Sequence, residues 1–94
     1  MDRANREVLK EALGRLIVIT WFDPYDANEE LNIKEIGNIK KAYYETSGFF
    51  IGVSNDQVLL GNNKDLDNEG TYKGYGVVPC SLITKVDIMD RNCR

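Results

Sequence analysis

The fold depends most on residues 48–60, which read GFFIGVSNDQVLL. Apolar β-branched and aromatic side chains on both sides of a polar centre predict two strands joined by a tight turn. Asn55 and Asp56 occupy that centre, and both residue types tolerate the left-handed backbone of a two-residue turn. Gly48 and Gly52 lie inside the first strand, where glycine permits a sharp bend or the close approach of another backbone. The stretch therefore predicts a hairpin whose long first strand curls, as in a small β-barrel.

A strand preceded by a helix is predicted on the N-terminal side of this hairpin. Residues 15–22, RLIVITWF, are rich in β-branched and aromatic side chains and stop before Pro24. Both faces of this strand are apolar, so we expect it to be covered on both sides, on one of them by the helix. The helix is expected over residues 2–13, with Asp2 as its N-terminal cap and Gly14 as its C-terminal cap. Its expected apolar residues recur at helical spacing: Ala4, Val8, Leu9, Ala12 and Leu13.

The remaining segments complete a mainly β chain. The long strand is expected to begin near Ile39, after an insertion at 23–38 in which a short helix over 26–36 is favoured against irregular structure. The C-terminal side is expected to hold, in order, a polar loop at 61–70, a strand at 72–78, a break at 79–81, a strand at 84–89 and a frayed tail at 90–94. The predicted fold is a single domain over residues 1–94: an N-terminal α-helix followed by a strongly bent, five-stranded antiparallel barrel.

Composition limits the functions that this domain can have. The chain has 94 residues, no histidine, two cysteines and a formal net charge of −3. Without histidine it lacks the commonest general base, the commonest zinc ligand and the usual partner of a nucleophilic serine or cysteine. The negative charge argues against coating duplex nucleic acid by bulk neutralisation of phosphates, whereas local recognition of a strand stays open. We therefore expect no enzymatic activity and no cofactor.

The sequence also bears on where in the cell the protein is located. No apolar run approaches the roughly 20 residues that a membrane helix needs, and residues 1–7 contain no apolar core of a secretory signal. We therefore expect a cytoplasmic chain in which Cys80 and Cys93 are reduced thiols.

Three clusters of chemically active residues are better explained by structural roles. Residues 65–70, DLDNEG, match the first half of a calcium-binding loop, but Gly76 stands where the bidentate glutamate belongs, so a solvated hairpin loop is favoured. Cys80 lies between two strands and could act as a nucleophile, but no histidine is present to activate it. Carboxylates near Pro24 could form an acid–base pair, yet turn and cap roles explain them more simply; they are Asp23, Asp26, Glu29 and Glu30. No catalytic or metal-binding residue is expected.

The order of elements resembles the Sm-like family of small β-barrels. Residues 48–60 are similar to the family's first motif, in which a glycine-bent strand runs into an Asp, a short loop and an Asn that opens an apolar strand. Residues 76–86, GVVPCSLITKV, occupy the position of the second motif. The ending VPCSLI at 78–83 is also similar to small Sm-like proteins of phage and environmental origin. The two motifs cover residues 48–89, and the layout extends the resemblance to the N-terminal helix.

This resemblance implies a homo-oligomeric ring, in which the fourth strand of one copy pairs with the fifth strand of the next, and single-stranded RNA as the ligand. The chain departs from the family at its nucleotide-contacting positions. Ser54 and Gln57 replace the Asp and the Asn, and Pro79-Cys80 replaces a basic residue followed by glycine, so a uridine-type pocket is not carried over intact. The candidate nucleic-acid contacts are Ser54, Asn55, Asp56 and Gln57 in one turn and Cys80 and Ser81 in the other.

Alternatives remain for each of these features. The six polar residues also suit ordinary turns. The tyrosines at strand positions either stack on bases or pack within the sheet; they are Tyr43, Tyr44, Tyr72 and Tyr75. The negative charge and the missing basic residue favour a second class of function, in which the barrel is a protein-interaction or viral structural module that binds no nucleic acid.

Overall fold

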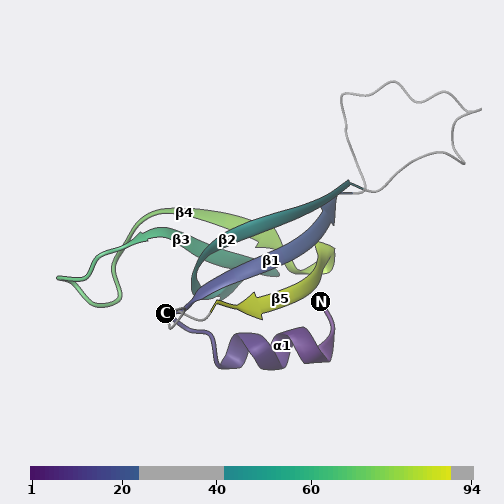
Figure 1. Ribbon diagram of the computed structural model, residues 1–94, viewed down its shortest axis with the longest axis horizontal. Coiled ribbons are helices and arrows are strands. Elements are labelled where there is room, and N and C mark those ends of the chain that lie inside the picture. Colours follow the sequence, from purple (N-terminus) through teal and green to yellow (C-terminus); the bar gives the residue numbers. More distant parts are fainter. Residues whose placement is uncertain (24–41, 90–94) are drawn as a thin grey trace, which may run out of the picture.

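The computed structural model describes residues 1–23 and 42–89 (Figure 1). In chain order its elements are α1 (Arg3–Lys10), β1 (Leu16–Asp23), β2 (Ala42–Ser54), β3 (Gln57–Lys64), β4 (Tyr72–Pro79), the short 3-10 helix η2 (Cys80–Leu82) and β5 (Ile83–Ile88). The predicted short helix at 26–36, the predicted tail at 90–94 and Cys93 lie outside the described residues. In the part of the chain that the structure describes, no helix has the length and apolar character needed to cross a membrane.

The five strands form one antiparallel sheet in the order β4-β3-β2-β1-β5. β4 and β5 are its two end strands, and within the described residues they do not pair with each other. The sheet therefore bends back on itself without closing into a barrel (Figure 1). The prediction of a mainly β chain with an N-terminal helix and five antiparallel strands is confirmed, while the two open ends are the feature that a closed barrel lacks.

β2 carries the bend because its first half pairs with β1 and its second half pairs with β3. Gly48 lies at the change of partner, where an added Cβ would come within 2.8 Å of the Leu60 Cβ, so the close approach of β3 requires glycine. The register between β2 and β3 shifts between Phe50 and Gly52, which makes Ile51 the extra residue of a bulge. The predicted role of a glycine in bending this strand is thus met at Gly48.

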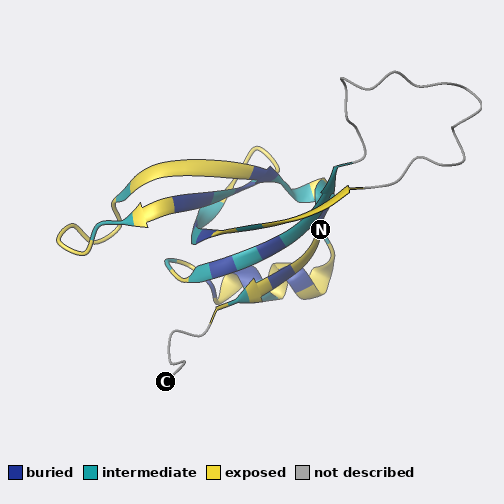
Figure 2. Ribbon diagram, turned by 45° about the horizontal axis from the view of Figure 1, so that its top comes forward, coloured by how far each residue is buried: buried dark blue, intermediate teal, exposed yellow. Residues whose placement is uncertain are grey.

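The core lies inside the bend, between the concave side of the sheet and α1 (Figure 2). Ile17, Ile19 and Val58 are fully buried at its centre. Leu9 of α1 and Ala12, just beyond the helix, contribute from the helical side. The remaining core residues come from the strands and are Phe50, Leu60, Val78, Ile83 and Val86.

β1 is covered on one face rather than on both. Ile17 and Ile19 are fully buried, whereas Leu16 and Val18 on the other face are only half-buried. α1 packs mainly against β5. The predicted two-sided cover is therefore only half met, because the described residues place no second layer over the convex face.

α1 begins as predicted and ends earlier than predicted. Asp2 caps the helix, since one of its carboxylate oxygens accepts a hydrogen bond from Asn5 N at 2.8 Å. The helix ends a full turn before Gly14, which has φ +75°. There Arg15 N donates to Ala12 O at 2.8 Å, so the glycine serves the turn that leads into β1 and is not the helix cap.

The polar loop after β3 is shorter than predicted. β3 continues to Lys64, so Asn62 and Asn63 belong to the strand and lie opposite β4. Pairing with a neighbouring strand has here overridden the low β propensity of asparagine. Asp65 then turns the chain, because its Oδ1 accepts hydrogen bonds from Asp67 N at 2.9 Å and Asn68 N at 3.2 Å.

Candidate nucleic-acid interface

The first candidate turn joins β2 to β3. Ser54 and Gln57 pair across it, and the two residues between them have positive φ, 52° for Asn55 and 57° for Asp56. Two successive left-handed residues are the mark of a type I′ hairpin turn, as the sequence predicted. Gln57 is half-buried and the other three are exposed. Their polar groups are therefore open to solvent.

The second candidate turn lies directly against the first. Cys80 N donates to Asp56 O at 2.8 Å, and Pro79 pairs with Gln57 in the ladder between β3 and β4. η2 follows at once, so the exposed Ser81 lies at the same end of the sheet as the hairpin turn. The structure thus brings all six candidate residues together from two distant parts of the sequence. We call this surface the joined turns.

The joined turns offer hydrogen-bonding groups and almost no charge. Asn55 and Gln57 carry amides, and Ser54 and Ser81 carry hydroxyls. Amides suit the donor and acceptor patterns of base edges, and hydroxyls bond phosphate or sugar oxygens. Asp56 is the one charged residue among the six, and its negative sign opposes phosphate. Contacts to bases are therefore better suited to this surface than contacts to the phosphate backbone.

Of the other chemical clusters considered from the sequence, two lie within the described residues and one lies mostly outside them. Cys80 is a free, half-buried thiol. The carboxylate of Asp65 is engaged by the backbone N–H groups of Asp67 and Asn68, and these hydrogen bonds lower the pKa of Asp65. Within residues 1–23 and 42–89, no three His, Cys, Asp or Glu side chains gather as a metal site would require. Of the four carboxylates near the first proline, only Asp23 lies in the described part of the chain.

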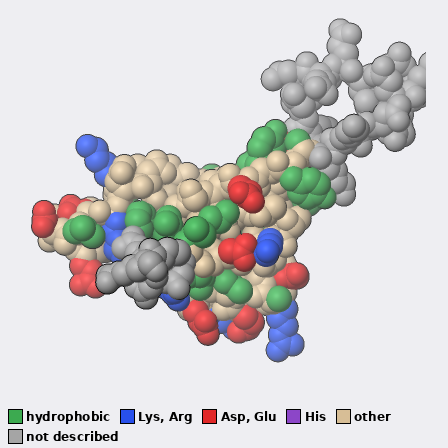
Figure 3. Space-filling view, viewed as in Figure 1, with side chains coloured by type: hydrophobic (Ala, Val, Ile, Leu, Met, Phe, Trp, Pro, Cys, Tyr) green, Lys and Arg blue, Asp and Glu red, His purple; other side chains and the backbone are tan. Residues whose placement is uncertain are grey.

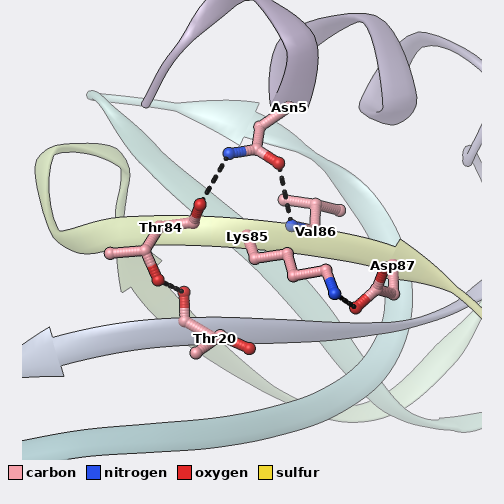
Figure 4. Close-up of polar contacts among 6 residues, drawn as sticks. All are labelled: Asn5, Thr20, Thr84, Lys85, Val86 and Asp87. Carbon is pink, nitrogen blue, oxygen red and sulfur yellow. Dashed lines mark hydrogen bonds and ion pairs between the residues drawn. The ribbon is translucent and has the colours of Figure 1, made fainter.

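Asn5 has a role that the sequence did not predict. It is the buried polar side chain of the described residues, and its amide spans two backbone groups of β5 (Figure 4). Nδ2 donates to Thr84 O at 3.1 Å, and Oδ1 accepts from Val86 N at 2.9 Å. Both groups lie on the side of β5 away from β1 (Figure 4). One amide therefore fills the donor and acceptor positions that a neighbouring strand would fill.

The buried face of the helix differs from the predicted one for the same reason. Ala4 was expected to be buried but is exposed, and Asn5 takes its place toward β5. Asn5 precedes the buried residues Leu9 and Ala12 by one turn and two turns of helix. That spacing could have indicated that Asn5 is buried. An asparagine in a helix is, however, ordinarily assigned to the solvent face, even where the spacing places it among apolar residues.

Two aromatic pairs lie where β1 ends and β2 begins. The ring centroids of Trp21 and Tyr44 are 5.0 Å apart, and those of Phe22 and Tyr43 are 6.2 Å apart. Trp21 Nε1 also donates to Thr46 Oγ1 at 2.9 Å. Tyr43 is 62% exposed and Tyr44 is 48% exposed, and hydrophobic side chains gather at this end of the molecule (Figure 3). These aromatics are packed in pairs and still open to solvent.

The other two candidate stacking tyrosines differ from each other. Tyr72 packs near Phe49, with ring centroids 6.2 Å apart, and Lys64 Nζ lies 5.7 Å from the centroid of the same Phe49 ring. Tyr75 is 70% exposed on β4. Packing therefore accounts for Tyr72, while Tyr75 belongs to the open edge of the sheet.

Comparisons with protein-family models, with curated proteins and with solved structures found no match to this chain. The likeness to Sm-like proteins stays a prediction from the sequence, carried by the motif at 48–60, the segment at 76–86 and the order of the elements.

Proposed function

We propose that this protein is a homo-oligomeric, Sm-like module that binds short single-stranded RNA through the joined turns and acts in RNA metabolism or regulation. The observation that supports this most is the hydrogen bond from Cys80 N to Asp56 O, 2.8 Å long. It sets two exposed polar turns side by side, so that amides and hydroxyls from both can contact one strand. A hairpin turn needs no such neighbour for its own stability.

Assembly is proposed from the two end strands of the sheet, although Asn5 already bonds two backbone groups at the edge of β5. Strand edges carry unpaired backbone groups, and these pair readily with another chain. β4 of one copy would pair with β5 of the next, closing a ring of identical contacts. A ring repeats the joined turns around its axis, so that weak contacts act together on one strand. This arrangement suits a chain with net negative charge, which cannot rely on a basic surface.

Light scattering coupled to gel filtration tests the assembly. A closed ring of head-to-tail contacts takes at least three copies, so the expected mass is at least three times that of the chain. A monomer mass at micromolar concentration would contradict the ring.

Titration with short oligo-U and oligo-A across a salt series tests the binding. We expect modest affinity and a shallow dependence on salt, because few phosphates are neutralised. The combined change Asn55→Gly and Gln57→Ala should weaken binding about tenfold by removing two amides. Glycine is chosen because the φ of 52° at Asn55 would strain alanine.

Asn63→Ala is the matched control for this double change. Its amide is exposed on the same strand as Gln57 but toward the opposite end of β3. Binding and assembly mass should both stay unchanged in the control, and the assembly mass should stay unchanged in the double variant as well.

A protein-interaction or viral structural module is the second candidate function. The bare edge of β4 supports it, since Tyr75 and Val77 are exposed there and an extended peptide could add to that edge. Absence of RNA binding even at low salt, where electrostatic attraction is strongest, would favour this function.

A further inference from the structure

Trp21 and Tyr44 form a packed aromatic pair near the surface. The register places the two residues opposite each other, their ring centroids lie 5.0 Å apart and their planes meet at 31°. The single N–H donor of the indole is satisfied by Thr46 Oγ1, so the ring needs no further polar partner. Tyr44 is nevertheless 48% exposed. The pair therefore presents exposed aromatic surface whose orientation is supported by ring packing and by one hydrogen bond.

This pair lies at the same end of the sheet as the joined turns. Trp21 is opposite Ile83 in the pairing of β1 with β5, and Ile83 follows η2 directly. β1 and η2 are in contact, and Trp21 and Cys80 both pack against the rim of the core. The connection from β4 to β5, which contains η2, lies toward the end of the sheet where β1 ends and β2 begins (Figure 1). The chain of contacts thus runs from Asp56 through Cys80 and η2 to Trp21.

We propose that Trp21 and Tyr44 form a stacking platform for a base of the single strand that lies on the joined turns. The proposal rests on the function proposed above and adds the residues that hold a base. Aromatic rings stack on any base and need no positive charge, so they suit single-strand binding by an acidic chain. The joined turns supply hydrogen bonds and the platform supplies stacking, two complementary parts of single-strand recognition.

The second aromatic pair provides a matched control. Tyr43 adjoins Tyr44 in β2, is 62% exposed and packs on Phe22 at a centroid distance of 6.2 Å. Successive residues of a strand point to opposite faces, so Tyr43 lies on the other side of the hairpin from Tyr44. Loss of either ring removes one aromatic pair from these two strands, whereas only loss of Tyr44 removes the platform.

Trp21 is the one tryptophan of the chain, so its fluorescence reports directly on the platform. The experiment titrates the assembled protein with oligo-U and oligo-A and follows both the anisotropy of the labelled oligonucleotide and the emission of Trp21. An abasic ribose-phosphate oligomer of equal length serves as the probe without bases. We expect the emission to be quenched over the same concentrations at which the oligonucleotide binds, and the abasic oligomer to cause no quenching. Tyr44→Ala should weaken binding about 5-fold or more, Tyr44→Phe should preserve it, and Tyr43→Ala should leave it unchanged.

The outcomes separate this proposal from the one on which it rests. Binding by anisotropy without a change in Trp21 emission, or equal losses in Tyr44→Ala and Tyr43→Ala, would overturn the platform and leave the joined turns as the site. Quenching that survives the combined Asn55→Gly and Gln57→Ala change would keep the platform and remove the turns from the site. If no oligonucleotide binds, both proposals fail, and a protein partner becomes the better explanation of the exposed aromatics.

Discussion

The two end strands of the sheet, β4 and β5, differ in what lies beside their free edges. Along β5, α1 packs beside the strand, and the Asn5 amide holds Thr84 O and Val86 N. Along β4, all residues from 73 to 77 are exposed, and within the described residues no strand pairs with its free edge. The edge of β5 thus has two of its backbone groups bonded by a side-chain amide, while no strand of the described residues pairs with the free edge of β4.

This difference bears on how a ring would close. A strand arriving at β4 finds backbone groups with no competitor. A strand arriving at β5 pairs beyond Thr84 and Val86 or displaces the amide of Asn5. β5 is therefore the edge at which a ring would meet resistance, and the two hydrogen bonds of Asn5 would set how large that resistance is.

The largest effect is expected from Asn5→Ala. The change removes both hydrogen bonds and leaves the N–H of the buried Val86 and the carbonyl of Thr84 without their partner. An unsatisfied buried group such as the Val86 N–H costs about 1–3 kcal/mol, and the lost hydrogen bond to the carbonyl of the exposed Thr84 costs about 1 kcal/mol more, together a large part of the about 5–15 kcal/mol that stabilises a domain. Denaturant unfolding at low protein concentration measures the loss.

Asn63→Ala is the control for this change. Its amide also donates to a backbone carbonyl, that of Lys73 on β4, but at 3.4 Å and exposed to water. We expect a loss below about 1 kcal/mol there. If a neighbour's strand pairs with β5 in the ring, the loss in Asn5→Ala should shrink as protein concentration rises, because that strand supplies the missing partners. Equal losses of stability in the two variants would show that Asn5 does not stabilise the edge of β5.

The sequence predicted the parts of the fold that local chemistry decides. The hairpin at 54–57 followed from two residues that tolerate positive φ, and the bend of β2 followed from Gly48. The role of Asn5 could not be predicted from its neighbours in the sequence, because its amide bonds β5, which lies nearly the whole chain away. The contact between the two candidate turns also could not be read from either turn, since it depends on the register of β3 against β4.

Val77→Pro tests the bare edge and has the second-largest expected effect. Cys80 N bonds Asp56 O, so the alternation of an antiparallel ladder directs the N–H of Val77 away from β3. A proline there removes a donor from the free edge and spares the ladder within the chain. We expect association to weaken about 10- to 100-fold, as measured by the mass in a dilution series, with little change in monomer stability.

Val53→Pro is the matched control for the edge. Val53 is 53% exposed against 45% for Val77, and it lies next to the hairpin turn on β2. The Val53→Pro change carries the same general cost in stability of placing a proline in a strand, but Val53 does not lie on β4. A dissociation as large in Val53→Pro as in Val77→Pro would mean that β4 is not the assembling edge.

The smallest effect concerns the loop that leads into the bare edge. Backbone hydrogen bonds from Asp67 and Asn68 stabilise the carboxylate of Asp65 and lower its pKa. A carboxyl whose pKa is lower in the folded state contributes its stability above the unfolded pKa and loses it as the pH falls through the folded pKa. We therefore expect the amide signals of Asp67 and Asn68 to titrate in acid together with the Asp65 carboxyl, as followed by NMR. Because the group is exposed, the effect on the whole domain should be slight.

A change in the same loop should affect β4 and β5 differently. Asp65 N also donates to Thr71 O at 3.0 Å, immediately before β4 begins, so loosening the loop frees the start of that strand. In Asp65→Ala at neutral pH, amide exchange should quicken in β4 and stay unchanged in β5, which Asn5 holds independently. Asp67→Asn keeps the Asp65 carboxylate and should leave both strands as they were. Equal quickening in β4 and β5 would show that the two edges open together, and the contrast between a satisfied edge and a bare one would then fail.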